Sequence, residues 1–421
     1  MIHTPTSPEP PLCFSIFAAV SPVHDEVVMR DLVERHVAPM RALGGVTSKA
    51  CGEPTAGPLV VFVATGGTES LVLQAVATRP REPALLVAHP GHNSLPASLE
   101  ALARLQQQGV RGRILYLCSP SDREALDQLR LAVHDSSVRR TLCESRIGLV
   151  GAPSDWLVAS SPAPDTVRSV WGPTVVSLPV GLILAEPDHD VTASGERIAK
   201  DVRVGATELV GLSESELPAA GRVHALLRRV VDQQRLDAVA VRCFDLVLQR
   251  KTSGCLALAQ LNDEGVTAGC EGDLVATVAM LWARRMFGTM PWMANPSRID
   301  PARGTLSLAH CTVPRSMCST YRLRSHFESG LGVSVQGTLR TGPVTLVRIG
   351  GKRMERLRAI EGELTRNTDH EDLCRTQVEV EIGGNALRDL LGDPLGNHIV
   401  MIPGRRADRL MQWHAAMVAE P

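Results

Sequence analysis

The chain has 421 residues, with 44 Lys and Arg against 45 Asp and Glu and a formal net charge of −1 at pH 7. This balance and an aromatic content of 3% argue against a nucleic-acid surface, which needs basic patches and aromatic rings for stacking. The apolar runs are shorter than a membrane-spanning helix. Residues 1–12 are rich in Pro and lack the layout of a signal peptide, so we expect them to form a flexible tail. We therefore expect a cytoplasmic globular protein, long enough for two or three domains, that binds neither nucleic acid nor membrane.

Ten cysteines are spread along the chain, and no two of them form a CxxC pair. A zinc knuckle built on that spacing is therefore not expected. Most of the cysteines lie inside apolar stretches, as Cys118 does in ILYLC. Buried free thiols in a reducing compartment are the simplest interpretation.

Residues 13–162 alternate short apolar runs with longer amphipathic ones. Strands are predicted at 12–20, 59–65, 83–89, 113–118 and 146–150, and helices at 24–43, 68–77, 94–108 and 122–134. Fully apolar strands that alternate with helices indicate a parallel sheet covered on both faces. We expect a Rossmann-like N-terminal α/β domain.

A second α/β domain is predicted over residues 163–295, and the pattern changes after Asn295. Strands are expected at 174–183 and 237–244 and a helix at 213–234, and residues 267–286 read as a strand end, a tight turn and a long apolar helix. Downstream, strands are predicted at 305–312, 332–340, 344–350, 376–382 and 398–402, before a helix at 408–418. Their alternation and Gly-rich turns indicate a C-terminal, mainly antiparallel β domain over residues 296–421.

Three polar loops follow predicted parallel strands: Ala64–Glu69 (ATGGTE), His89–Pro96 (HPGHNSLP) and Gly151–Trp156 (GAPSDW). Ligands bind at the carboxyl ends of strands in open α/β sheets, so we expect the three loops to share one edge of one sheet. The candidate substrate-binding residues on them are Thr68, Glu69, His89, Asn93, Asp155 and Trp156. The alternative is a structural role, in which Thr68 and Asn93 cap the helices that follow. The two His of HPGH are too few ligands for a metal site of their own.

The segment Ala268–Asp273 (AGCEGD) carries the strongest signal. Glu271 and Asp273 flank a glycine where a strand passes into an apolar helix. Carboxylates at a helix N-terminus are held ionised by the helix dipole, and such a pair can bind Mg²⁺ or Mn²⁺. The alternative is that Asp273 merely caps the helix.

Two histidines lie in or beside apolar strands of the C-terminal domain, His310 in LAHCT and His398 in GNHIV. A buried histidine is most often a satisfied part of a core, but together with a buried carboxylate pair these two point to a mixed O/N metal site. His326 is a further polar candidate. Arginines also gather downstream of His310, where they could bind an anionic substrate group or form a solvated face: Arg315, Arg322, Arg324 and Arg348.

Taken together, CEGD, AHCT and GNH resemble the carboxyl-terminal half of the L-fucose isomerase/L-arabinose isomerase superfamily, and the three N-terminal loops resemble its short, fucose-isomerase-like members. The resemblance covers nearly the whole chain. It implies a homo-oligomeric, metal-dependent aldose–ketose isomerase, with Mn²⁺ as the usual ion. Carried over by position, Glu271 and Asp273 match the metal-binding acid segment, His398 the late His ligand, and His310 a His of the arabinose branch.

The resemblance gives Glu271, Asp273 and His310 as candidate catalytic residues, and Arg348, from the arginine set, joins the N-terminal loop residues as a candidate substrate contact. A Lewis acid would stabilise the developing enediolate while a carboxylate moves the proton. The family's second catalytic glutamate is expected on the strand before CEGD, yet residues 252–262 (TSGCLALAQLN) contain no acid, and Gln260 is the nearest polar isostere.

That departure keeps four alternatives open. The same metal site could serve an epimerase, an aldol-type lyase or a dehydratase, all of which can pass through a similar enediolate. The chain could instead be a non-catalytic sugar-binding relative. A nicotinamide-dependent dehydrogenase is not expected, because no strand is followed by GxGxxG.

Overall fold

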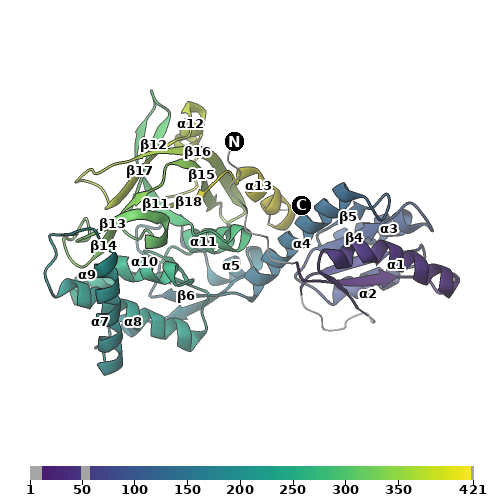
Figure 1. Cartoon of the computed structure of the whole chain (residues 1–421), viewed down its shortest axis with the longest axis horizontal. Coiled ribbons are helices and arrows are strands. Elements are labelled where there is room, and N and C mark those ends of the chain that lie inside the picture. The colour runs from purple at the N-terminus through teal and green to yellow at the C-terminus, as the bar shows by residue number, and fades with distance from the viewer. Residues whose placement is uncertain (1–11, 49–56, 419–421) are drawn as a thin grey trace. The chain divides into compact units, whose positions relative to one another are not determined.

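The computed structural model describes residues 12–48 and 57–418. The chain divides into two compact units, residues 1–141 and 142–421, and each is described by itself (Figure 1). The predicted tail at residues 1–12 lies almost entirely outside the described residues. In the described part, no helix is both long and apolar enough to cross a membrane.

The first unit is a parallel sheet in the order β2-β1-β3-β4-β5. Its strands are β1 Phe14–Ala19, β2 Gly45–Thr47, β3 Leu59–Val63, β4 Ala84–Ala88 and β5 Gly112–Tyr116. Its helices are α1 Glu26–Ala42, α2 Glu69–Ala77, α3 Ser94–Gln107 and α4 Arg123–Glu144, the last of which runs into the second unit. Apolar side chains of α1 and α4 cover one face of the sheet and those of α2 and α3 the other, which confirms the doubly covered parallel sheet.

The second unit begins with another parallel sheet, in the order β10-β9-β6-β7. Its strands are β6 Arg146–Val150, β7 Thr174–Leu178, β9 Ala238–Val241 and β10 Thr267–Gly269. The prediction that residues 146–150 extend the first sheet is wrong, because β6 pairs with β7 and β9. The GAPSDW loop therefore does not share a sheet edge with ATGGTE and HPGHNSLP.

Seven helices accompany this sheet among the described residues: α5 Pro164–Val170, α6 Gly181–Leu184, α7 His189–Gly205, α8 Glu216–Gln234, α9 Phe244–Arg250, α10 Cys255–Asp263 and α11 Leu274–Phe287. The acid-free stretch 252–262 thus lies mostly in a helix, α10, and the strand before CEGD is the short β10. Nine of the fourteen residues of α11 are A, V, L or M. It packs against β9 and β10 on one side and β15 and β18 on the other.

Most of the C-terminal strands close into a barrel of antiparallel pairs, in the order β11-β12-β17-β16-β15-β18. They are β11 Trp292–Asp300, β12 Thr305–His310, β15 Gly342–Gly350, β16 Arg356–Asn367, β17 Thr376–Glu381 and β18 Ile399–Pro403. A separate sheet joins β8 Leu209–Val210, β13 Cys318–Arg324 and β14 Ser334–Leu339. The remaining elements are the 3-10 turn Arg315–Met317 and the helices α12 Gly384–Gly392 and α13 Ala407–Met417. The predicted antiparallel β region is confirmed.

One apolar core continues from the helices of the second unit into the barrel. Leu217 of α8 and Leu256 of α10 belong to the same buried cluster as Leu308 of β12 and Met401 of β18. The helix α11 also contacts strands of both the parallel sheet and the barrel, so it packs between them. This packing brings the end of β10 close to the start of β18.

Candidate active site

The acid turn joins β10 to α11. Asp273 is the N-cap of α11, and its Oδ1 accepts a hydrogen bond of 2.8 Å from the amide of Ala276. Glu271 and Gly272 both have left-handed backbones, with φ of 61° and 70°. A Cβ on Gly272 would lie 2.7 Å from the carbonyl oxygen of Ala152, so glycine is required there. A non-glycine residue such as Glu271 adopts this conformation at a cost of about 1 kcal/mol or more, which the surrounding structure must supply.

His398 lies directly before β18, is fully buried and also has a positive φ, of 51°. Its Nδ1 donates a hydrogen bond of 2.9 Å to Oδ2 of Asp273. Its Nε2 lies 3.5 Å from Oε1 of Glu271, and this nitrogen has no hydrogen-bond partner among the described residues. The contact with Asp273 therefore fixes the ring and leaves Nε2 facing Glu271.

His310 is the last residue of β12 and is 3% exposed. Its ring centroid is 5.5 Å from that of His398, and its Nδ1 is hydrogen-bonded to the Thr312 hydroxyl at 2.8 Å. One ligand atom each from Glu271, His310 and His398 lie within 4.8 Å of one another. The structure thus brings together three of the four predicted metal ligands, and it places Asp273 behind His398.

The charges of this cluster depend on one another. Burial raises the pKa of Glu271, but the interaction with His398 and the hydrogen bond from Trp156 outweigh burial and lower that pKa to about 2. Burial lowers the pKa of His398, but Asp273 and Glu271 outweigh it and raise that pKa to about 9. Burial, followed by the charge of His398, lowers the pKa of His310 to about 4. Near neutral pH, Glu271 is therefore anionic and His310 is neutral.

This donor set fits a divalent cation. A carboxylate and two imidazoles are suitable ligands for borderline ions of the Mn²⁺ to Zn²⁺ series. The buried Nε2 of His398, which makes no hydrogen bond and lies 3.5 Å from Oε1 of Glu271, is the atom that such an ion would bind. The His398 Nδ1–Asp273 bond is the arrangement by which carboxylates orient histidine ligands.

A cavity of about 50 Å³ borders the cluster. Glu271 and His310 line it, together with Asn295, His326 and the exposed Glu328. Sequence analysis did not identify Asn295 or Glu328. Asn295 carries no motif, and Glu328 follows His326 in a loop far from CEGD in the sequence, so no local signal marked either residue.

The three remaining candidates of the second unit differ in their surroundings. The indole Nε1 of Trp156 donates to Oε2 of Glu271, although the side chain is 52% exposed. Asp155 instead forms an ion pair with Arg242 at 3.1 Å. Arg348 is 4% exposed, lies 3.7 Å from Asp273 and donates to the carbonyl oxygen of His398. Arg348 thus supports the cluster from behind.

The candidates of the first unit lie at the carboxyl edge of its sheet. The Thr68 hydroxyl donates to the carbonyl oxygen of Thr65, and Nε2 of His89 donates to that of Ala64. Thr68 and Asn93 are the N-cap residues of α2 and α3, as predicted, but neither side chain makes a cap hydrogen bond. Glu69 is half-buried and Asn93 exposed, and their substrate contacts stay predictions.

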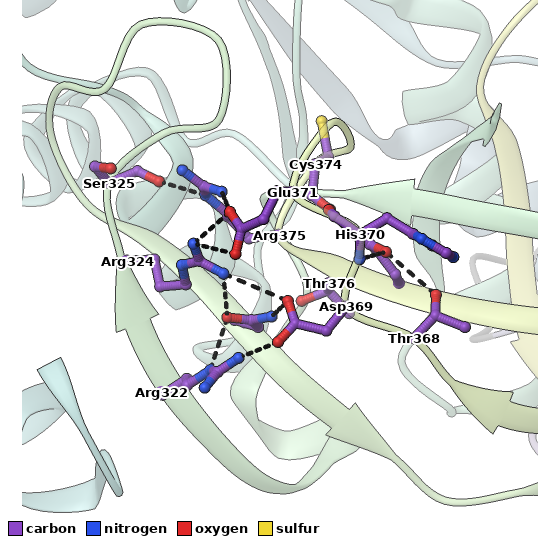
Figure 2. Close-up of polar contacts among 12 residues, drawn as sticks. Arg322, Arg324, Ser325, Thr368, Asp369, His370, Glu371, Cys374, Arg375 and Thr376 are labelled. Atoms are coloured by element: carbon purple, nitrogen blue, oxygen red, sulfur yellow. Dashed lines mark hydrogen bonds and ion pairs between the residues drawn. The ribbon is translucent and has the colours of Figure 1, made fainter. Parts of the chain in front are cut away.

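The arginines downstream of His310 are paired with protein groups. Arg322 and Arg324 form ion pairs with Asp369, and Arg324 also pairs with Glu371 at 2.9 Å (Figure 2). Arg315 contacts Asp263 and Gln260, which places Gln260 in a surface network rather than among the residues that line the cavity.

Three curated proteins show sequence similarity to the chain. The sulfoquinovose isomerases of Priestia aryabhattai and Priestia megaterium are each 21% identical over 315 residues, which cover 70% of this chain and 68% of the relative. That of Clostridium sp. (strain MSTE9) is 20% identical over 323 residues, or 73% of this chain and 70% of the relative. No family model matches. The similarities support a sugar isomerase, without confirming the fucose-isomerase-like subgroup.

Proposed function

We propose that the chain is an aldose–ketose isomerase that works through an enediol(ate), with a divalent cation, Mn²⁺ in the first place, held by Glu271, His310 and His398. The observation that carries this proposal is the buried group of Glu271, His310 and His398, whose ligand atoms lie within 4.8 Å of one another and in which Nε2 of His398 makes no hydrogen bond. A bound divalent ion would supply Lewis-acid stabilisation of the negative charge that develops on the sugar oxygens. Asp273, predicted as a ligand, acts in this proposal by orienting His398.

Side chains of the protein bind the cation, transfer the proton and form hydrogen bonds with the reacting oxygens. A carboxylate with a pKa of about 2 is a good anionic ligand and a weak base, which favours the ligand role for Glu271. We assign the transfer of the proton between C1 and C2 to a second carboxylate, Glu328, because it lines the same cavity and residues 252–262 offer no acid. Neutral His310 can accept or donate a hydrogen bond to the reacting oxygens.

The substrate is proposed from the relatives, which are named for sulfoquinovose. A cavity of about 50 Å³ is smaller than the roughly 300–1,000 Å³ of a complete ligand pocket, so it suits the reacting end of an open-chain sugar. No Lys or Arg is found among the described residues that line it, so a sulfonate would have to lie beyond them. We also propose that the enzyme is cytoplasmic, from its composition, and a homo-oligomer, from the resemblance alone.

The test is an isomerisation assay with metal-stripped protein, with and without Mn²⁺ added back. Substrates would be sulfoquinovose, its non-sulfonated parent sugar and neutral six-carbon aldoses, followed by NMR in D₂O. We expect metal-dependent formation of a ketose, with deuterium entering at the carbon next to the carbonyl. Turnover of the parent sugar but not of sulfoquinovose would restrict the proposal to neutral sugars. Exchange without ketose formation would instead indicate an epimerase, and sugar binding without any metal response would indicate a non-catalytic relative.

A further inference from the structure

A second group of potential metal ligands lies on the wall of the same cavity. Cys255, Cys311 and His326 are all buried, and one ligand atom from each lies within 4.8 Å of the others. A third thiol, that of Cys374, is in hydrogen-bonding contact with Cys311 and also lines the cavity. Glu271, His310 and His398 do not explain this cluster, since their donors are oxygen and nitrogen.

The four side chains come from separate segments of the second unit. Cys255 is the first residue of α10, Cys311 follows β12, His326 lies in the loop between β13 and β14, and Cys374 precedes β17. Three thiols and one imidazole form the Cys₃His set of tetrahedral structural zinc sites. In such a tetrahedron the sulfurs lie about 3.8 Å apart, from a Zn–S bond of about 2.3 Å. Cys255, Cys311 and His326, with ligand atoms within 4.8 Å of one another, need a modest contraction to reach this, and Cys374, which contacts Cys311, would complete the set by moving toward the other two.

The surroundings of the cluster suit a thiolate-bound metal. Nδ1 of His326 is hydrogen-bonded to the Ser329 hydroxyl at 3.0 Å, which orients the ring and leaves Nε2 as the ligand atom. The backbone amide of Arg375 donates to the Cys311 sulfur. Hydrogen bonds of this kind commonly support sulfur ligands of metals.

Charge supports the same conclusion. Three thiolates and one Zn²⁺ leave a net charge of −1. The guanidinium of Arg375 interacts electrostatically with Cys311 and Cys374 and lies 5.8 Å from the ring centroid of Phe327. In Figure 2 the sulfur of Cys374 is directed away from the network that Arg324 and Arg375 form with Glu371. Arg324 and Arg375 therefore lie next to the proposed site, but their side chains are held by Glu371 and do not take a ligand position.

We propose that Cys255, Cys311, Cys374 and His326 bind one Zn²⁺ or a similarly thiophilic ion, distinct from the cation of the isomerase site. The ion would join the start of α10, the end of β12 and the segment before β17. Because Cys311 follows His310, it would also fix the strand end that carries His310. Its role is to hold the site in place rather than to take part in the chemistry.

The test uses the full-length protein, purified without chelator from cells grown with zinc. Elemental analysis should find about one zinc per chain. Protein loaded with Co²⁺ should show a strong sulfur-to-cobalt charge-transfer band and the intense visible bands of a tetrahedral thiolate site. These bands should disappear in Cys255→Ser and Cys374→Ser. They should remain in Cys318→Ser, a half-buried cysteine outside the cluster, and in Glu271→Gln, which alters only the O/N site.

Three results would overturn the proposal. The first is wild-type protein that holds no zinc and gives no thiolate–cobalt bands when Co²⁺ is supplied. The second is a disulfide among Cys255, Cys311 and Cys374 in peptides mapped without reduction from freshly purified protein. The third is retention of the bands in both serine variants. The Co²⁺ spectrum of the wild-type protein tests the proposal without any variant, so the proposal remains testable even if a serine variant does not fold.

Discussion

The carboxyl edges of the two parallel sheets use similar residues in different ways. At the first sheet, the hydroxyl of Thr68 and the ring of His89 are buried and donate to nearby backbone carbonyls. At the second, Glu271 and His398 are buried as a charged pair, and Nε2 of His398 has no hydrogen-bond partner in the described part of the chain. A buried polar group with its bonds completed stabilises a fold, whereas an uncompleted one points to a ligand.

Backbone strain does not separate the two regions. Glu271 and His398 have positive φ, but so do His92 and Asn93 in the HPGH loop. The two regions differ in charge, since only the second buries a charged pair, and in hydrogen bonding, since only there does a buried histidine nitrogen lack a partner among the described residues. The predictions below test that difference.

The largest effect is expected for Glu271→Gln. The substitution keeps the shape but removes the negative charge, so Mn²⁺ affinity should fall and kcat/KM should drop by about a hundredfold or more. Glu328→Gln is the matched comparison, since we expect it to lower kcat while Mn²⁺ binding persists. Metal titration and steady-state kinetics on both variants measure this. Unchanged Mn²⁺ affinity in Glu271→Gln would contradict the assignment of this ligand.

Asp273 should affect metal binding through His398. Asp273→Asn keeps an N-cap side chain but weakens the bond that orients the imidazole, so we expect metal affinity to fall about 10–100-fold with little loss of stability. Asp273→Ala should lose the same affinity and about 1 kcal/mol of stability as well, because the cap bond to Ala276 disappears. Calorimetric metal titration and urea unfolding distinguish the two losses. Equal destabilisation by both variants would mean that the charge, not the cap, supports the helix.

A smaller effect is expected at Trp156. Its indole donates to Glu271 and helps to keep the pKa of that carboxyl low. Trp156→Phe should raise the pKa of Glu271 by about one unit or more, since a hydrogen bond to a charged group contributes about 1.5–3 kcal/mol. The acid limb of the kcat/KM profile should move to higher pH. An unshifted limb would show that another group controls it.

At the first sheet, Ser94→Ala should affect stability alone. The Ser94 hydroxyl donates to the carbonyl oxygen of Val63 and accepts from the amide of His89, so its loss leaves buried groups unpaired and costs about 1–3 kcal/mol. The kinetic constants should stay at wild-type values. Glu69→Gln and Asn93→Ala test the opposite possibility, since a raised KM in either would show that this loop contacts substrate.

The smallest effect is on the pH dependence of metal-free protein. The pKa of His398 is raised from 6.5 to about 9, so its contribution to stability is complete below pH 6.5 and is lost as the pH rises through 9. Glu271, with a pKa lowered from 4.5 to about 2, contributes above pH 4.5 and loses this as the pH falls through 2. Urea midpoints of wild type and His398→Gln should therefore converge above pH 9. A constant difference would refute the ion pair.

Sequence patterns predicted those parts of the molecule that local information specifies. Period and apolar runs located β1, β3, β4 and β5 of the first sheet but missed the three-residue β2, and the CEGD turn placed Glu271 and Asp273 at the start of α11. The partner sheet of β6 could not be predicted, because an apolar strand of this kind fits either parallel sheet. Strands β11 and β16 were missed, since half-exposed barrel strands such as β16 carry few apolar residues.

The site was only partly predictable for a related reason. His310 and His398 stood out because they adjoin apolar strands, but their approach to Glu271 depends on α11 packing between the second sheet and the barrel. Glu328 and the thiol cluster could not be predicted from the sequence, since these residues come from separate segments with no common spacing. The absence of a CxxC pair, which argued against zinc, says nothing about ligands brought together by tertiary structure.

The most direct test is a Mn²⁺ titration of metal-stripped protein, with the free ion followed by electron paramagnetic resonance. It needs no knowledge of the substrate. We predict one saturable Mn²⁺ site per chain in wild type and in Cys374→Ser, and its loss in Glu271→Gln and in His398→Ala. Two results would contradict the proposed metal centre: wild-type protein with no saturable Mn²⁺ site, or Glu271→Gln and His398→Ala variants that both bind Mn²⁺ as tightly as the wild type.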